Sequence, residues 1–260
     1  MNTWINKLIL LSSVLISSHS FANEIKSTSL LDEKNFSATL IFRTNYVFRG
    51  TSFSGNEGTI QGSFDWTYGN WFAGIFGSSL DNQNQDRNFN KLGIGGEFEL
   101  DYILGYASSF NGFDWMIMPV IYTYPGQDAN GARDDTTLEV FTSISRQVED
   151  VTGSPVFKFE FSWSPEYFEN ADRSLYYRGS VALTIANEFG LDFGYGYTDI
   201  GETNDFFVVS YSHWDIGLTK SALGFDFDLR YHDTSSDEEQ ALGVGFALDS
   251  EIVFSVTRSF

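Results

Sequence analysis

Charged residues recur at every second position in several stretches of this chain, with apolar residues between them. In one such stretch, Glu97, Glu99 and Asp101 alternate with Phe98 and Leu100. Residues two positions apart in an extended strand lie on the same face. A face that carries carboxylates and guanidinium groups could line an aqueous passage, where opposed charges create a transverse electric field that filters ions. The chemistry that this pattern predicts is the filtering of ions and small solutes.

The alternation predicts a set of pore-lining residues on the polar faces of the strands. These candidates are Arg43, Arg49, Glu97, Glu99, Asp101, Glu139, Lys158, Glu160, Arg178, Asp192, Asp226, Asp228 and Arg230. A lysine or arginine at mid-depth in a bilayer costs about 2–4 kcal/mol, so these side chains should point inward if the apolar faces meet lipid. Two arrangements stay open: the charges line an open channel, or they pair and fill a closed interior. The excess of acids favours cations.

Catalytic and metal chemistry have weaker signals. After residue 22 the histidines are His213 and His232, and no G-x-S-x-G motif occurs. A hydrolase that used either histidine as its base would need a nucleophile beside it. We favour interfacial histidines and predict no catalytic residue and no cofactor. Acidic groups at 199–205 and 233–239 lack the spacing of a calcium loop, so we predict no metal site, although divalent ions bridging them to lipopolysaccharide stay an alternative.

The composition favours strands that have one apolar and one polar face. Aromatic residues make up 17% of the chain, with 26 Phe and 13 Tyr, and there are 24 Gly and no Cys. A formal net charge of −20 argues against a nucleic-acid partner. No apolar run after the N-terminal region is long enough for a transmembrane helix. An apolar outer face around a polar lumen is typical of a membrane β-barrel.

Alternation and turn residues together predict twelve strands. They span 36–49, 59–68, 71–80, 97–107, 113–124, 136–147, 155–164, 174–186, 189–199, 206–219, 224–231 and 251–260. Connections after the even strands are short, and those after the odd strands are mostly longer and more polar, as in bacterial outer-membrane proteins. The predicted fold class is therefore all-β: a transmembrane antiparallel β-barrel with short periplasmic turns and longer extracellular loops. Residues 241–249 are either loop or an outward extension of the last strand.

The N-terminal residues predict export. Lys7 precedes a short apolar core at 8–16, and Ser20-Phe21-Ala22 supplies small residues before a cleavage site. We expect 1–22 to be a cleaved signal peptide, 23–35 a periplasmic segment, and 36–260 the barrel. The predicted location is the outer membrane of a Gram-negative cell.

The last ten residues form a strand that ends on an aromatic residue. Ile252, Phe254, Val256 and Phe260 share one face. Phe260 is therefore predicted to close the barrel at the periplasmic rim. The expected partners are outer-membrane lipids, lipopolysaccharide, small solutes and the barrel-assembly machinery, which would bind this C-terminal strand. Monomer and trimer both stay open.

Motifs spread over most of the chain resemble a known family. They are Asn45-Tyr-Val-Phe-Arg-Gly-Thr-Ser52, Gln61-Gly-Ser-Phe-Asp65, Phe72-Ala-Gly-Ile-Phe-Gly-Ser78, Glu99-Leu-Asp-Tyr102 with Gly105-Tyr106, Tyr122-Thr-Tyr-Pro-Gly126, Ser162-Trp-Ser-Pro-Glu-Tyr-Phe168, Trp214-Asp-Ile-Gly217 and Phe254-Ser-Val-Thr-Arg-Ser-Phe260. The chain thus resembles the TorF family of porin-like proteins, also catalogued as conserved hypothetical proteins of the Gcw type. The resemblance implies an outer-membrane barrel with a channel role, but it brings no solute and no site residues. A longer acidic last loop around 233–240 departs from the family pattern.

The function expected from these observations is passive diffusion of small hydrophilic solutes or ions through the barrel. A closed barrel that acts as a structural protein, adhesin or receptor through its acidic loops is the alternative. An outer-membrane lipid hydrolase that depends on His213 or His232 is a third, weaker hypothesis.

Overall fold

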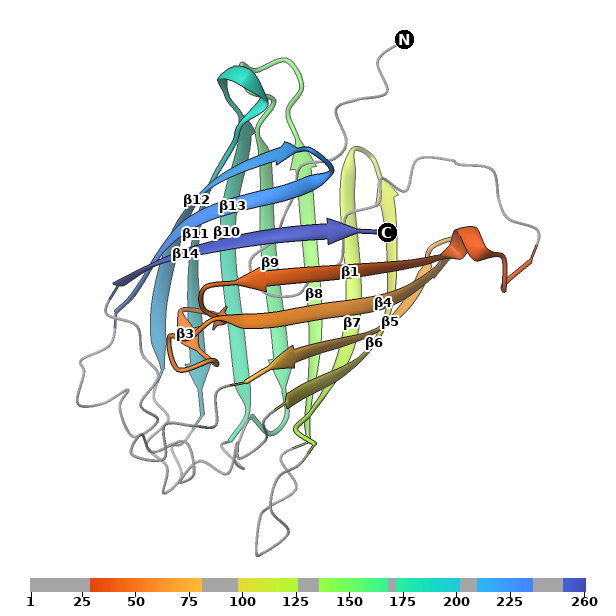
Figure 1. The fold of residues 1–260 in the computed structure, drawn as a ribbon, viewed down its shortest axis with the longest axis vertical. Helices are drawn as coiled ribbons and strands as arrows, with labels where there is room; N and C mark the ends of the chain where they lie inside the picture. Colours follow the sequence, from red (N-terminus) through yellow and green to blue (C-terminus); the bar gives the residue numbers. More distant parts are fainter. Residues whose placement is uncertain (1–28, 81–97, 126–135, 168–171, 202–209, 236–249) are drawn as a thin grey trace, which may run out of the picture.

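The computed structural model describes residues 29–80, 98–125, 136–167, 172–201, 210–235 and 250–260 (Figure 1). The predicted signal peptide 1–22, the first part of the predicted periplasmic segment, Glu97 and residues 241–249 lie outside the described residues. Within the described part of the chain, no helix is long and apolar enough to cross a membrane.

Twelve antiparallel strands form one closed barrel, as predicted (Figure 1). They are β1 (Phe36–Arg43), β4 (Thr59–Tyr68), β5 (Trp71–Ser79), β6 (Phe98–Phe110), β7 (Phe113–Thr123), β8 (Thr137–Gln147), β9 (Val156–Ser164), β10 (Ser174–Thr184), β11 (Gly190–Ile200), β12 (Tyr211–Ala222), β13 (Phe225–Ser235) and β14 (Ser250–Ser259). Strands β2 (Val47–Phe48) and β3 (Thr51–Ser52) form a separate small sheet. Short 3₁₀ turns, η1 (Glu33–Asn35) and η3 (Ala186–Glu188), precede β1 and β11.

The two ends of the barrel differ in their connections. At one end, here called the turn end, tight hairpins join neighbouring strands. Asn111 and Gly112 both adopt positive φ, as a two-residue type I′ hairpin requires. Longer segments join the strands at the other end, here called the loop end. This difference follows the predicted alternation of short and long connections.

The barrel closes between its first and last strands. Arg43 of β1 pairs with Thr59 of β4 on one side and with Ser255 of β14 on the other. At the turn end, the backbone of Ala38 exchanges two hydrogen bonds with that of Phe260, with N···O distances of 3.2 and 2.9 Å. The backbone of Phe260 thus lies beside the first strand, where the barrel closes.

The outer surface of the barrel is apolar. Large hydrophobic side chains that are 38–64% exposed occur on all twelve strands, including Ile60 of β4, Tyr195 of β11 and Ile252 of β14. Such a surface would be unfavourable in water and suits lipid. The period-two pattern therefore predicts the outward faces correctly.

The first predicted strand, 36–49, is too long. β1 ends at Arg43, and residues 44–58 fold into the barrel as a segment called here the inner hairpin, which contains β2 and β3. Tyr46 and Phe48, predicted to continue the lipid-facing row of β1, are only 6% and 4% exposed and belong to the interior cluster. Alternation alone could not mark the strand end, because these aromatic residues are buried in the lumen instead of in lipid.

One side of the lumen is apolar. The inner hairpin packs against inward side chains of β5, β6 and β7, including Phe76, Ile103 and Val120. Both faces of β7 are therefore apolar, which explains why alternation is weak over Phe113–Tyr124.

Candidate functional site in the barrel lumen

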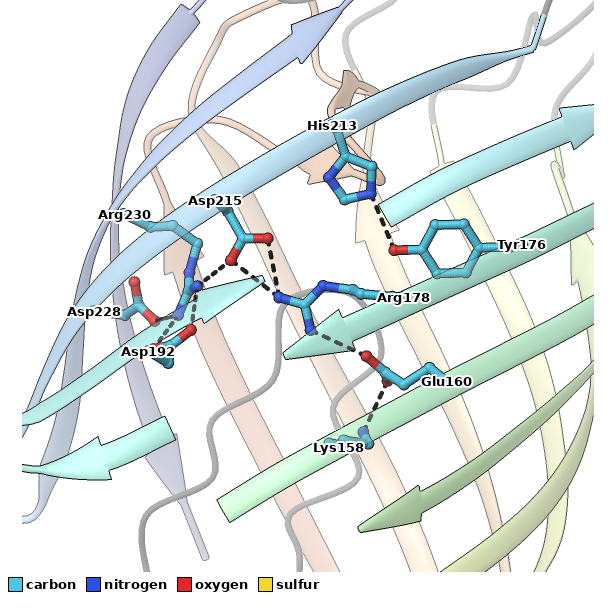
Figure 2. A network of polar contacts seen from close by, with 9 residues as sticks. All are labelled: Lys158, Glu160, Tyr176, Arg178, Asp192, His213, Asp215, Asp228 and Arg230. Atoms are coloured by element: carbon cyan, nitrogen blue, oxygen red, sulfur yellow. Dashed lines mark hydrogen bonds and ion pairs between the residues drawn. The ribbon is translucent and has the colours of Figure 1, made fainter. Parts of the chain in front are cut away.

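The opposite side of the lumen carries a continuous network of charges across five neighbouring strands (Figure 2). This network, called here the charged wall, consists of Lys158 and Glu160 on β9, Arg178 on β10, Asp192 on β11, Asp215 on β12, and Asp228 and Arg230 on β13. All seven side chains project from the inner faces that the alternation defines.

Ion pairs connect the first half of the wall from strand to strand. Lys158 Nζ lies 2.8 Å from Glu160 Oε1, and Arg178 Nη1 lies 3.0 Å from Glu160 Oε2. The other terminal nitrogen of Arg178 lies 2.9 Å from Asp215 Oδ2. Arg178 thus passes over the intervening strand β11 to connect β9 with β12.

Arg230 completes the wall from the other direction. Its guanidinium group donates to both oxygens of Asp192, at 2.6 and 2.9 Å, and to Asp228 Oδ2 at 2.9 Å. It also donates to Asp215, so Asp215 accepts hydrogen bonds from two arginines while only 1% exposed (Figure 2). Removing one partner of a buried ion pair is strongly destabilising, so these groups depend on one another.

Glycines on the inner faces of β11 and β12 make room for the arginines. A Cβ atom at Gly194 would collide with the Arg178 guanidinium, and one at Gly217 would collide with that of Arg230. The two side chains can lie flat on the wall because these positions carry no side chain. The run of alternating glycines in β11 therefore has a packing reason.

Exposure changes along the charged wall. Arg178 and Asp215 are almost fully buried, whereas the side chains of Glu160, Asp192 and Asp228 are 20%, 17% and 15% exposed. Asp192 and Asp228 lie close to the turn end of their strands. Because all of these side chains point inward, water reaches this part of the wall from inside the barrel.

Near the loop end, the Arg49 side chain of the inner hairpin reaches across the lumen to β8 and β9. Arg49 Nη1 lies 2.7 Å from Glu139 Oε1 on β8, and Nη2 lies 2.8 Å from Ser162 Oγ on β9. Its guanidinium carbon lies 4.0 Å from the centre of the Tyr176 ring, a cation–π contact. Burial by itself would lower the pKa of Arg49, but the Glu139 carboxylate outweighs it and raises that pKa, so Arg49 stays charged.

Further contacts hold the hairpin to the opposite side of the barrel. Thr234 Oγ1 on β13 donates to the Gly50 carbonyl at 2.7 Å, and Asn45 Nδ2 donates to Glu251 Oε2 on β14 at 2.6 Å. Gly50 has a φ of +77°, and a Cβ there would collide with Thr234. The hairpin is therefore fixed to both sides of the lumen and narrows it.

The remaining predicted pore-lining residues lie apart from the charged wall. Arg43 points inward from β1 and makes no ion pair with any described residue. Asp226 lies at the turn end and accepts a hydrogen bond from Ser221. Glu99 and Asp101 lie on β6, within the apolar side of the lumen. Arg49 is buried in the inner hairpin and does not belong to the first strand.

The interpretation of the histidines as interfacial is wrong. His213 and His232 are 4% and 5% exposed and lie on inner faces. His213 Nε2 lies 3.0 Å from the Tyr176 hydroxyl, and the two rings stack (Figure 2). Neither side chain reaches the lipid-facing surface.

The central residue of the wall, Asp215, is not among the predicted pore-lining residues. Asp215 alternates with Trp214 and Ile216, which lie on the opposite face of β12. Applying the period-two rule to this strand would have placed Asp215 in the lumen. Tyr176 and Ser162 had no comparable signal, because their importance depends on the inner hairpin.

The closed twelve-stranded barrel with a polar inner wall has the fold of outer-membrane porins. The NanC porin has the same architecture, with a TM-score of 0.50 and 10% identity over 85% of this chain and 97% of that chain. At this identity the likeness concerns the fold alone. An outer membrane channel from Pseudomonas putida F1 (TM-score 0.48, 9% identity, 86% and 95% covered) and LpxR from Salmonella typhimurium (0.46, 11%, 86% and 99%) are more distant.

The chain belongs to the family described as "Bacterial protein of unknown function (Gcw_chp)", which matches residues 31–260. The Gcw part of the sequence resemblance is thereby confirmed. No curated relative matches the chain.

Proposed function

We propose that this protein is an outer-membrane channel through which small hydrophilic solutes or ions diffuse passively. The observation that carries this proposal is the charged wall, whose Glu160, Asp192 and Asp228 side chains are partly exposed inside the barrel. A barrel that served only as a scaffold could fill this space with apolar side chains, as it does beside β5–β7.

The wall also suits the small hydrophilic solutes or ions that we propose. Its four carboxylates outnumber its three cationic groups, and the ion pairs place both kinds of charge side by side along one side of the lumen. Such a wall offers hydrogen-bond donors and acceptors to polar solutes and favours cations weakly. The inner hairpin restricts the passage, so we expect a small conductance.

The cellular setting is part of the same proposal. The apolar outer surface would contact outer-membrane lipids and lipopolysaccharide, and the barrel-assembly machinery would recognise β14 with its terminal Phe260. Export would use the predicted signal peptide 1–22. The resemblance to the TorF family supports the channel role.

Recording from planar lipid bilayers tests the proposal. The full mature chain, refolded in detergent and added to a bilayer in KCl, should give discrete conductance steps, and a protein-free detergent sample should give none. Boiling the protein before addition should abolish the steps. A folded preparation that never produces steps would contradict the channel function.

The buried Arg49–Glu139 pair favours a second candidate, a barrel that stays closed. Both side chains are at most 1% exposed, and their ion pair joins β8 to a hairpin that is also fixed to β13 and β14. A closed barrel would act as a structural protein, adhesin or receptor through its loops. It predicts a folded protein that is electrically silent, so the bilayer recording separates the two functions.

A further inference from the structure

A second group of charges, outside the charged wall, has no counter-charge. Glu99 and Asp101 project from the inner face of β6 and are 1% and 3% exposed. Neither forms an ion pair with a lysine or arginine among the described residues. Glu99 Oε2 and Asp101 Oδ1 are buried without a hydrogen-bond partner. Buried polar atoms normally have partners, so these two oxygens indicate a missing ligand.

Tyrosines surround the two carboxylates. Asp101 lies directly opposite Tyr122 of β7, and the hydroxyl of Tyr46, from the inner hairpin, donates a hydrogen bond to Glu99. Burial raises the pKa of Tyr46 and of Tyr124, and the nearby negative charges of Glu99 and Asp101 raise both further. The hydroxyls of Tyr46 and Tyr124 therefore lie near both carboxylates.

Two like charges cannot stay buried together without compensation. A single shared proton would leave one negative charge in the apolar side of the lumen, and two protons would neutralise the pair without adding a ligand. A divalent cation would neutralise both carboxylates and give both unpartnered oxygens a ligand. Oxygen donors without nitrogen or sulfur suit a hard cation, and Ca²⁺ tolerates irregular geometry better than Mg²⁺ does.

We propose that Glu99 and Asp101 form a calcium-binding site on the inner face of β6. Each residue supplies carboxylate oxygens to the ion. Through the hydrogen bond from Tyr46 to Glu99, the bound ion also holds the inner hairpin against β6. The site is independent of the channel proposal, because binding requires no conduction.

Equilibrium dialysis and thermal unfolding test the site. The full mature chain in detergent micelles is stripped of metal with EDTA, then measured at neutral pH in CaCl₂, in MgCl₂, and in KCl of equal ionic strength. We expect CaCl₂ to raise the unfolding temperature of the wild type by a few degrees more than MgCl₂ or KCl does. The chain should bind one more calcium ion than the Glu99→Gln/Asp101→Asn double variant binds.

A matched control is Glu251→Gln, which alters another carboxylate facing the lumen, one already hydrogen-bonded to Asn45. This control should keep both the calcium-dependent shift and the full number of bound ions. If the double variant does not fold, Asp101→Asn alone serves, and its bound calcium should fall by one ion. Equal calcium binding by wild type and variant would overturn the proposal. So would a wild type that is stabilised by acid but not by calcium, because the pair would then hold a proton.

Discussion

The two sides of the lumen bury their residues by opposite means. The charged wall on β9–β13 satisfies each charge with a neighbour on the same wall. The side formed by β5–β7 uses aromatic and aliphatic packing, with the inner hairpin as its partner. The wall therefore needs nothing from the hairpin to satisfy its charges, whereas the apolar side would be exposed to water without it. This difference implies that the hairpin can be altered while the wall stays intact.

Removing the inner hairpin should have the largest effect. Arg43 and Thr59 are paired across β1 and β4, so an Asn-Gly turn can replace residues 44–58 and join the two strands directly. We expect the single-channel conductance to rise several-fold, because the segment that crosses the lumen is gone. Bilayer recording measures the change, and heat-dependent migration in gels shows whether the variant is folded. A folded variant with unchanged conductance would show that the hairpin does not narrow the passage.

Breaking the Arg49–Glu139 pair tests how the hairpin is held. Arg49→Met leaves Glu139 buried beside Ser162 and Tyr122 without a cation, and should lower the free energy of unfolding by about 3–5 kcal/mol. Adding Glu139→Gln removes the uncompensated charge and should recover part of this loss. Urea unfolding followed by tryptophan fluorescence measures both. A double variant as unstable as the single one would argue against the ion pair.

Neutralising Asp215 tests the charged wall. Asp215→Asn weakens the hydrogen bonds from Arg178 and Arg230, which keep Glu160, Asp192 and Asp228 as partners. The free energy of unfolding should therefore fall by less than in Arg49→Met, by about 2–3 kcal/mol in the same urea experiment.

The matched control for Asp215→Asn is Asp199→Asn. The Asp199 side chain is 37% exposed and lies 3.7 Å from Arg173, so this change should lower the free energy of unfolding by under about 1 kcal/mol. If Asp215→Asn and Asp199→Asn lowered the free energy of unfolding equally, the wall would not be a cooperative network.

The smallest expected effect comes from filling the space over β11. Gly194→Ala places a methyl group where the Arg178 guanidinium lies, and the flexible side chain must shift, at a cost of about 1–2 kcal/mol. Gly179→Ala is the matched control, because nothing lies within 4 Å of its added Cβ. Thermal unfolding of the two variants gives the comparison, and a Gly194 variant as stable as the Gly179 variant would contradict the packing role.

Period-two alternation was enough to predict the barrel and most of its wall. It placed Lys158, Arg178 and Arg230 in the lumen, because a charge in lipid is too costly for any other arrangement. It could also have placed Asp215. Alternation of apolar and polar residues identifies the two faces of a strand, so it predicts side-chain direction only where the chain continues as a strand.

The sequence could not predict the inner hairpin or its contacts. Tyr46 and Phe48 continue the alternation of β1, and the period does not distinguish burial in lipid from burial in the lumen. The partner of Arg49 is 90 residues further along the chain, on β8. Contacts of this kind depend on barrel closure, which brings β1 and β8 to opposite sides of one lumen.

Chemical accessibility inside the working protein tests the central claim, that water and solutes pass beside the charged wall and not through the apolar side. The chain has no cysteine, so single cysteines report without background. Ser180→Cys lies on the inner face of β10 opposite Lys158, and Ala107→Cys lies in the apolar cluster. During single-channel recording, a charged methanethiosulfonate reagent should change the conductance of the Ser180 variant and leave the Ala107 variant unchanged. Modification of Ala107→Cys alone, or a barrel that never conducts, would contradict the account.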